Sequence, residues 1–259
     1  MKINNDMKSK WLIRFDKEMS KNGRRKYWEN IHRQHNYENV FSITEDAGVR
    51  NRIKRVLLDN VRSVLIPGCG SQVFLQKDLV NQYNIKRIVC TDYKAVVEMA
   101  QKRFAHKKIS YLAKDSTKLA FRNKFDAVVI VNSAVSESDA ENRKMLRSCW
   151  RSLKKGGALV GYFPTIFCAV DIGLIDPQTG IMKRVCLEKS MFYEEKQKQH
   201  QIFYTPLRLR CILKEAGFKL GRMEICFFDS KYFQKEGSNY YGLGDKDLVI
   251  YGLFVVATK

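Results

Sequence analysis

The sequence lacks the features of several protein classes. No apolar run approaches the roughly 20 residues that a membrane-spanning helix needs, and the polar N-terminus has no hydrophobic segment typical of a secretory signal. Its seven cysteines form no C-x-x-C pair, so neither a zinc site nor a disulfide framework is expected. With 45% hydrophobic residues, the composition indicates a globular protein, expected to be cytoplasmic and without a metal.

Acidic residues are few relative to basic ones. The chain has 47 Lys and Arg against 27 Asp and Glu, a formal charge of +20, which favours contact with polyanions. Arg143, Arg147, Arg151 and Lys154 recur every three or four residues on an expected helix and would form one basic stripe. A solvated basic surface is the favoured interpretation, because charge patterning alone rarely identifies a partner, and an RNA-binding surface is the alternative.

Residues 61–92 have the pattern of a nucleotide-binding unit. An apolar segment, 61–67, leads into Gly68-Cys69-Gly70, and a second apolar segment ends at Asp92. The two glycines allow a sharp turn close to a ligand, and the following helix start provides free N–H groups. A carboxylate about 20 residues after the first glycine is placed to bind ribose hydroxyls. The pattern therefore predicts a site for a ligand that contains a nucleoside.

Two common nucleotide motifs are missing. A dinucleotide-binding loop would carry a third small residue where this chain has Val73, so a nicotinamide oxidoreductase is the least favoured enzyme. No Gly-Lys-Ser or Gly-Lys-Thr follows the turn, which excludes a P-loop of the ordinary kind.

The order of the motifs resembles that of class I S-adenosylmethionine-dependent methyltransferases. The Gly68-Cys69-Gly70 loop resembles the first motif of that family, and the resemblance extends over roughly residues 56 to 259. It implies a methyltransferase that uses S-adenosylmethionine and releases S-adenosylhomocysteine. The further segments that carry the resemblance are Asp92-Tyr93, Lys114-Asp115-Ser116, Phe125–Val131, Leu153–Val160, Tyr204–Leu207 and Glu215–Phe218.

The expected fold is α/β, a doubly wound and mostly parallel seven-stranded sheet with an antiparallel C-terminal strand and helices on both faces. Strands of Val, Ile and Leu without alternation indicate burial on both faces. Strands are expected at 61–67, 87–91, 109–112, 125–131, 157–163 and near 248–258, and helices at 49–58, 72–83, 94–104 and 139–153.

The resemblance also implies the residues that bind the cofactor. Asp92 with Tyr93 would meet the ribose, Asp115 with Ser116 the adenine, and Asn132 the methionine end. The family's acidic residue that usually holds the methionine ammonium is replaced by Ile66, so another group must make that contact. The remaining expected cofactor residues are Pro67, Gly68, Cys69, Gly70 and, from the N-terminal segment, Tyr27.

Three regions are expected along the chain. Residues 1–55 show amphipathic turns near 11–15 and 27–32. The resemblance implies that they form a helical segment over the cofactor mouth and that residues 56–259 form the methyltransferase domain. Within that domain, 164–200 follows the fifth strand at the edge where ligands bind in open α/β sheets. Because long loops often carry function, we expect this segment to be a substrate lid, with a packing insertion as the alternative.

Methyl transfer mainly requires orientation and exclusion of water, with a general base only where the acceptor arrives protonated. His200 is the first candidate for that base and His32 the second, although a lone histidine is more often structural. The segment after the fourth strand, Val131–Ser136, is not the Asn/Asp-Pro-Pro-Tyr/Phe tetrapeptide of branches that methylate amino groups of bases or glutamine.

The favoured function is therefore methylation of an O, N or C atom of a small or medium-sized acceptor. Two alternatives stay open. One is an RNA methyltransferase that uses the basic surface, and the other is a catalytically silent basic binding module, motivated by Ile66.

Overall fold

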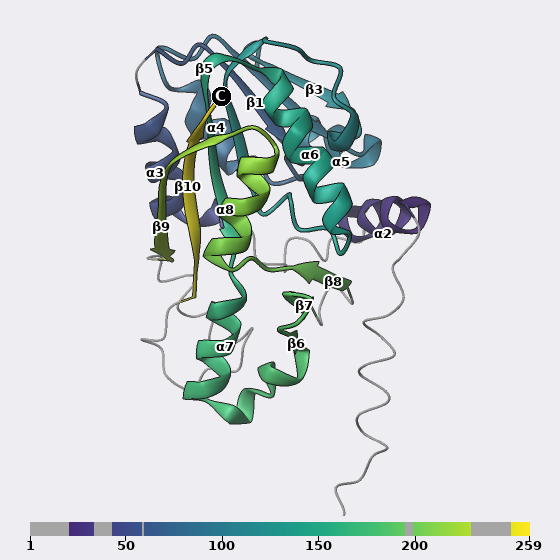
Figure 1. Cartoon of the computed structure of the whole chain (residues 1–259). Coiled ribbons are helices and arrows are strands. Elements are labelled where there is room, and N and C mark those ends of the chain that lie inside the picture. Colours follow the sequence, from purple (N-terminus) through teal and green to yellow (C-terminus); the bar gives the residue numbers. More distant parts are fainter. Residues whose placement is uncertain (1–20, 34–42, 59, 195–198, 229–249) are drawn as a thin grey trace, which may run out of the picture.

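The computed structural model describes residues 21–33, 43–58, 60–194, 199–228 and 250–259 (Figure 1). Its centre is a seven-stranded sheet with the strand order β3-β2-β1-β4-β5-β10-β9. The strands are β1 (Ser63–Pro67), β2 (Arg87–Asp92), β3 (Ile109–Ala113), β4 (Phe125–Val131), β5 (Leu153–Pro164), β9 (Lys219–Phe227) and β10 (Tyr251–Thr258).

The first five strands are parallel, and β10 runs antiparallel to both of its neighbours, β5 and β9. The helices are α2 (Lys21–Arg33), α3 (Ala47–Val56), α4 (Phe74–Val80), α5 (Lys94–Arg103), α6 (Asp139–Ser152), α7 (Ile166–Ile175) and α8 (Pro206–Glu215). Short 3₁₀ turns are η1 (Ile43–Glu45), η2 (Ser116–Lys118), η3 (Pro177–Thr179) and η4 (Ile181–Arg184).

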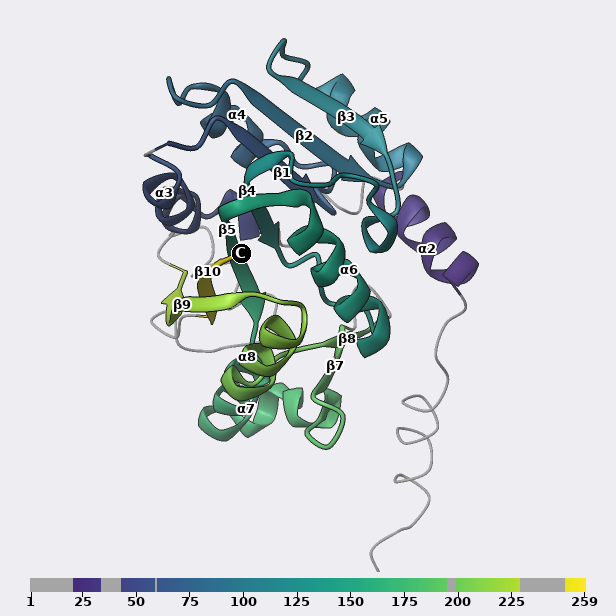
Figure 2. The ribbon, with the colours of Figure 1, turned by 45° about the horizontal axis from the view of Figure 1, so that its top comes forward.

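Helices cover both faces of the sheet, as Figures 1 and 2 show. Because side chains alternate along a strand, Val64 and Ile66 of β1 pack in one core with α3 and α4, whereas Leu65 packs in the other with α6 and α8. The predicted fold class is confirmed in the number of strands in the sheet, in strand direction and in burial of both faces. No helix among the described residues combines the length and apolar character needed to cross a bilayer.

Several predicted boundaries are wrong by a few residues. The helix expected at 72–83 is the shorter α4, because the glycine loop continues to Val73 before the helix begins. The strand expected at 157–163 begins at Leu153, and the left-handed Gly156 (φ 74°) lies within it. The helix expected at 49–58 begins at Ala47, because Asp46 accepts a hydrogen bond from the Val49 N–H at 2.9 Å.

Some predicted segments fall outside the described residues. These are the helical turn at 11–15 and the first part of the strand expected at 248–258.

The segment predicted as 164–200 folds into a small unit that ends at residue 202, and we call residues 164–202 the insertion. It contains α7, η3, η4 and a second, antiparallel sheet of β6 (Val185–Cys186), β7 (Met191–Glu194) and β8 (Gln199–Ile202). The Tyr204 N–H donates to the Pro164 carbonyl at 2.8 Å, which brings the two ends of the insertion together. Figures 1 and 2 show it below the large sheet, on the side away from β3.

Asp126 fixes the amino ends of the central strands. Its carboxylate accepts hydrogen bonds from the Arg62 N–H (3.0 Å), the Ser63 N–H (2.8 Å) and hydroxyl (2.7 Å), and the Lys154 ammonium (2.6 Å). Burial works to raise the pKa of Asp126, but the hydrogen bonds from Lys154 and Ser63 outweigh it and lower the pKa. The carboxylate therefore stabilises the fold in its ionised form.

We expect Asp126→Asn to lower the free energy of unfolding by about 1–2 kcal/mol at pH 7, because charge-assisted hydrogen bonds are lost. The folded-state pKa lies below the unfolded value of about 3.9, so the difference should narrow as the pH falls below about 4. Urea unfolding of both proteins at pH 7 and below pH 4 measures this. An equal deficit at both pH values would contradict the role assigned to the charge.

Candidate active site

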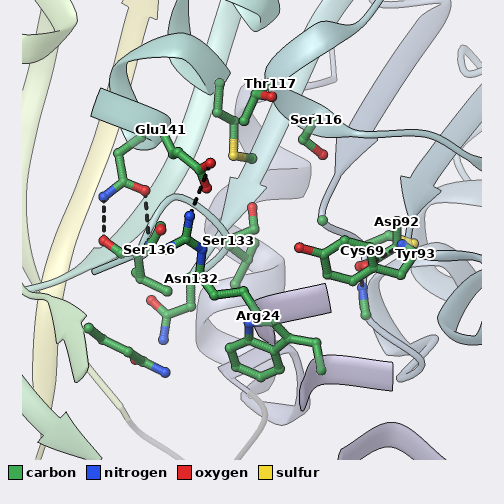
Figure 3. Close-up of a pocket in the computed structure, with 18 of the residues that line it drawn as sticks. Arg24, Cys69, Asp92, Tyr93, Ser116, Thr117, Asn132, Ser133, Ser136 and Glu141 are labelled. Carbon is green, nitrogen blue, oxygen red and sulfur yellow. Dashed lines mark hydrogen bonds and ion pairs between the residues drawn. The ribbon is translucent and has the colours of Figure 1, made fainter. Parts of the chain in front are cut away.

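A cavity opens at the carboxyl ends of β1, β2, β3 and β4, where the strand order reverses between β1 and β4. This is the place where open α/β sheets bind ligands. We call it the first cavity (Figure 3). It brings together eight of the ten predicted cofactor residues: Gly68, Cys69, Gly70, Asp92, Tyr93, Asp115, Ser116 and Asn132.

The glycine loop is held against the loop after β4. Gly68 and Gly70 have φ angles of 63° and 65°, a left-handed backbone conformation that residues other than glycine rarely adopt. A Cβ atom on Gly68 would lie 2.5 Å from the Cβ of Ser133. The Ser133 hydroxyl donates to the Pro67 carbonyl at 2.9 Å, and the Gly68 N–H donates to the Thr91 carbonyl at 2.7 Å. The loop therefore presents bare backbone to the cavity.

Asp92 lies at the tip of β2 beside this loop (Figure 3). One carboxylate oxygen accepts from the Gly70 N–H at 2.9 Å, and the other accepts from the Tyr93 N–H at 2.7 Å. Burial raises the pKa of Asp92 to about 6, although these two hydrogen bonds act in the opposite direction. Each oxygen keeps a further lone pair, so the carboxylate can still accept from two ligand hydroxyls.

The loop after β3 is shaped by its own acid. Asp115 accepts from the Thr117 N–H at 2.9 Å and from the Thr117 hydroxyl at 2.7 Å, and this capping starts η2. Asp115, Ser116 and Thr117 all line the first cavity. The turn thus fixes the wall of the cavity beyond the tip of β3.

Two buried amide oxygens face the same cavity from different elements. Asn132 follows β4 with a left-handed φ of 47°, and Gln199 on β8 is only 2% exposed. The Asn132 Oδ1 and Gln199 Oε1 atoms are buried without a hydrogen-bond partner among the described residues. Because a buried polar atom normally has a partner, both oxygens indicate a ligand with N–H or O–H donors.

Arg24 attaches α2 to the rim of the cavity. Its guanidinium lies 3.2 Å from the Glu137 carboxylate and 3.1 Å from that of Glu141 on α6. Arg24 is 7% exposed and lines the first cavity together with Trp28 and Glu141. Figure 3 shows the Arg24 side chain directed at Glu141. Sequence reasoning missed this residue and Gln199, because neither belongs to a local motif.

The other predicted site residues lie elsewhere. Pro67 and Tyr27 do not line the first cavity. The Tyr27 ring contacts Trp28 edge-on, and burial, followed by the nearby Glu194 and Tyr193, raises the pKa of its hydroxyl. His200 alternates along β8 with Gln199 and Gln201, which do line the cavity.

The two candidate histidines therefore receive no support from the geometry. The His200 ring centre lies 5.0 Å from that of Tyr193, on the other side of the strand from the cavity. His32 belongs to α2, but its side chain is outside the described part of the chain.

A second cavity adjoins the first, between β5, α7 and the small sheet. The two cavities share three lining residues, Ile43, Asn132 and Gln201, so they meet at Asn132. The rest of the second cavity is mainly apolar and aromatic. It is lined by Tyr162, Pro164, Thr165, Cys168, Ala169, Ile172, Glu194, Phe203, Phe228, Ile250 and Tyr251.

Three residues of the predicted basic stripe lie on α6, whereas Lys154 lies on β5, so the prediction of a single helix is wrong for Lys154. The stripe is also partly neutralised. Arg143 bonds Asp139 at 2.6 Å and also pairs with Glu215, and Lys154 bonds Asp126 at 2.6 Å. Arg147 and Arg151 are exposed. Two of the four cations are therefore already bound to carboxylates.

Comparison with known proteins agrees with this geometry. Residues 65–161 match the family model described as a methyltransferase domain. Comparison with curated proteins gave no match.

Solved structures share the fold at low sequence identity. A SAM-dependent methyltransferase from Methanosarcina mazei is 16% identical with a TM-score of 0.58, and the match covers 80% of this chain and 96% of that protein. A SAM-dependent methyltransferase from Thermotoga maritima, described as a possible histamine N-methyltransferase, is 20% identical with a TM-score of 0.56, and the match covers 90% of this chain and 99% of that protein. The N-methyltransferase NodS from Bradyrhizobium japonicum, crystallised with S-adenosylhomocysteine, is 16% identical with a TM-score of 0.52, and the match covers 83% of this chain and 88% of NodS.

The family-model match over residues 65–161 and the strand order of the sheet thus identify a methyltransferase domain with the class I fold in the core of this chain.

Proposed function

We propose that this enzyme methylates a small molecule that binds in the second cavity while S-adenosylmethionine binds in the first. The main support for the proposal is that the two cavities adjoin, with Asn132, Ile43 and Gln201 lining both. A cofactor in one cavity and an acceptor in the other would face each other at this junction. Holding both reactants in fixed orientation is the main contribution that a protein makes to such a transfer.

The first cavity fits the nucleoside part of the cofactor. The carboxylate of Asp92 would accept hydrogen bonds from the two ribose hydroxyls, and Asp115 with Ser116 would meet the adenine. The bare backbone at Gly68 and Gly70 allows close approach of the ligand. When bound, the cofactor supplies an electrophilic methyl group on a sulfonium ion.

The amino-acid end of the cofactor requires partners that the usual motif does not provide. Ile66 is 4% exposed and packs in the core with α3 and α4. The buried oxygens of Asn132 and Gln199 are acceptors of the kind that an ammonium group needs. We therefore assign the methionine ammonium to these two amides in place of the missing acid.

The insertion supports a small acceptor rather than a polymer. It forms one side of the second cavity through Cys168, Ala169, Ile172 and Glu194, which limits the space there. We propose that it acts as the substrate cap expected from the sequence. Because His200 lines neither cavity, we assign it no role as a base.

RNA methylation stays the alternative. The exposed Arg147 and Arg151 favour it, whereas the carboxylate partners of Arg143 and Lys154 argue against it. A nucleic-acid substrate would make turnover fall steeply with salt, because phosphate contacts release counterions.

Transfer of a labelled methyl group from S-adenosylmethionine tests the proposal. The protein would be incubated in parallel with pools of small molecules and with RNA, each at low and moderate salt. We expect label in the small-molecule pool and little effect of salt. Label only in RNA, lost at moderate salt, would show that the alternative is correct.

We expect Asp92→Asn to weaken S-adenosylhomocysteine binding by about 10–100-fold, because the amide has only one acceptor oxygen for two hydroxyls and no charge. Calorimetric titration measures the change. Asp78→Asn is the matched control, since Asp78 on α4 pairs with Arg50 at 2.9 Å outside both cavities. Equal affinities of wild type and Asp92→Asn, with both melting normally, would refute the ribose assignment.

Titration of the Asp92 carboxylate should make the affinity for S-adenosylhomocysteine depend on pH. The pKa of Asp92 in the free protein is raised to about 6, and only its ionised form can accept from both hydroxyls. Affinity for S-adenosylhomocysteine should be constant above about pH 7 and fall by about tenfold per pH unit below 6. Calorimetry from pH 7.5 to 5 on wild type and Asp92→Asn separates this effect from other titrations. A slope that persists in the variant would assign the pH dependence to another group.

A further inference from the structure

One extended segment of the insertion contacts both cavities. Gln199 and Gln201 of β8, and Phe203 directly after it, occupy alternate positions, so their side chains lie on the same face. Gln199 lines the first cavity, Gln201 lines both, and Phe203 lines the second. At about 3.3 Å per residue, the three positions span about 13 Å. The segment is therefore long enough to reach from the proposed cofactor site to the proposed acceptor site.

The other face of β8 packs against protein. The His200 ring centre lies 5.0 Å from that of Tyr193, the residue opposite it on β7. Ile202 is 1% exposed and packs in the core with α6 and α8. The strand thus has one side that faces the cavities and one side that fixes its position in the fold.

β8 is also bonded to the loop that carries Asn132. The Ile202 N–H donates to the Val135 carbonyl at 3.2 Å, and the Tyr204 hydroxyl donates to the Ala134 carbonyl. The loop after β4 and the strand β8 therefore form one continuous wall, and each of them carries one of the two buried amide oxygens of the first cavity.

Gln199 makes the position of β8 sensitive to a ligand. Its side chain is 2% exposed, and its Oε1 has no hydrogen-bond partner among the described residues. A buried acceptor that has lost its bond to water costs free energy for as long as it stays unpaired. A donor on the ligand, such as the ammonium group of the cofactor, removes this cost. β8 is therefore held in place more firmly when the first cavity is occupied.

We propose that β8 couples the two sites and that Gln199 is a positioning residue for the acceptor. The cofactor fixes β8 through Gln199, and the strand then holds Gln201 and Phe203 in place beside the acceptor. This coupling rests on the proposed function, in which the cofactor occupies the first cavity and the acceptor the second. It implies that each ligand binds more tightly when the other is present.

Amide hydrogen exchange of the full chain, with and without saturating S-adenosylhomocysteine, tests the coupling without a known acceptor. The informative peptides contain α7 and β7, because the residues that these elements contribute line the second cavity alone. We expect exchange there to slow by about fivefold or more, since the ligand removes the cost of the unpaired oxygen. Unchanged exchange in α7 and β7, with calorimetry showing the ligand bound, would overturn the coupling. Failure of S-adenosylhomocysteine to bind would instead overturn the proposed function.

Gln199→Leu identifies the residue responsible. At saturating S-adenosylhomocysteine we expect this variant to keep the slowed exchange at Gly68–Gly70 and to lose it in α7 and β7. Gln199→Glu, which keeps an acceptor for the ammonium group, should retain both effects. His200→Gln is the matched control, because His200 lies on the same strand and lines neither cavity. Slowing of α7 and β7 in Gln199→Leu as in wild type would refute the role of Gln199, and the wild-type comparison holds even where a variant fails to fold.

Discussion

The close approach of the loops after β1 and β4 is the constraint on which the site depends. These strands are neighbours in the sheet, and the chain leaves them toward opposite sides, so their loops form the two walls of the first cavity. The contact of Gly68 with Ser133 leaves no room for a side chain on the glycine. In this position of the glycine loop, the Gly70 N–H donates a hydrogen bond to the Asp92 carboxylate. The steric contact therefore determines both the shape of the cavity and the orientation of the Asp92 carboxylate.

In the proposed function, the insertion adds an acceptor site to the cofactor cavity. Its strand β8 places Gln199 and Gln201 in the first cavity, and β7 places Glu194 in the second. From the other side, Arg24 of α2 pairs with Glu141 on α6 and forms a buried ion pair with Glu137, just before α6. The removal of one partner from such a buried pair leaves an uncompensated charge, so α2 is firmly attached where it meets the cavity.

The parts of the site that a local pattern encodes could be predicted from the sequence. Strand burial, the glycine loop and the acid at the tip of β2 are each defined by a few consecutive residues, and the sheet order follows from the family that they resemble. The residues that depend on distant packing could not be predicted. Arg24, Gln199 and Glu194 reach the cavities only because α2 and the small sheet dock there, and no periodicity in the sequence indicates this.

His200 shows why proximity in sequence is a weak guide. In a strand a shift of one residue moves a side chain to the opposite face. The predicted base is adjacent to two cavity residues and is therefore directed away from the cavity. The residues at which helices begin and end could not be predicted either. The start of α4, for example, depends on how far the glycine loop extends before the backbone becomes helical.

Amide hydrogen exchange of the full chain, with and without S-adenosylhomocysteine, tests most directly that the cofactor lies at the carboxyl ends of β1 to β4. We expect slower exchange in the peptides that contain Gly68–Gly70, Asp92–Tyr93, Asp115–Thr117 and Asn132, with no change at the amino ends of the same strands. Protection confined to another part of the chain, or none at saturating ligand, would contradict this placement of the cofactor.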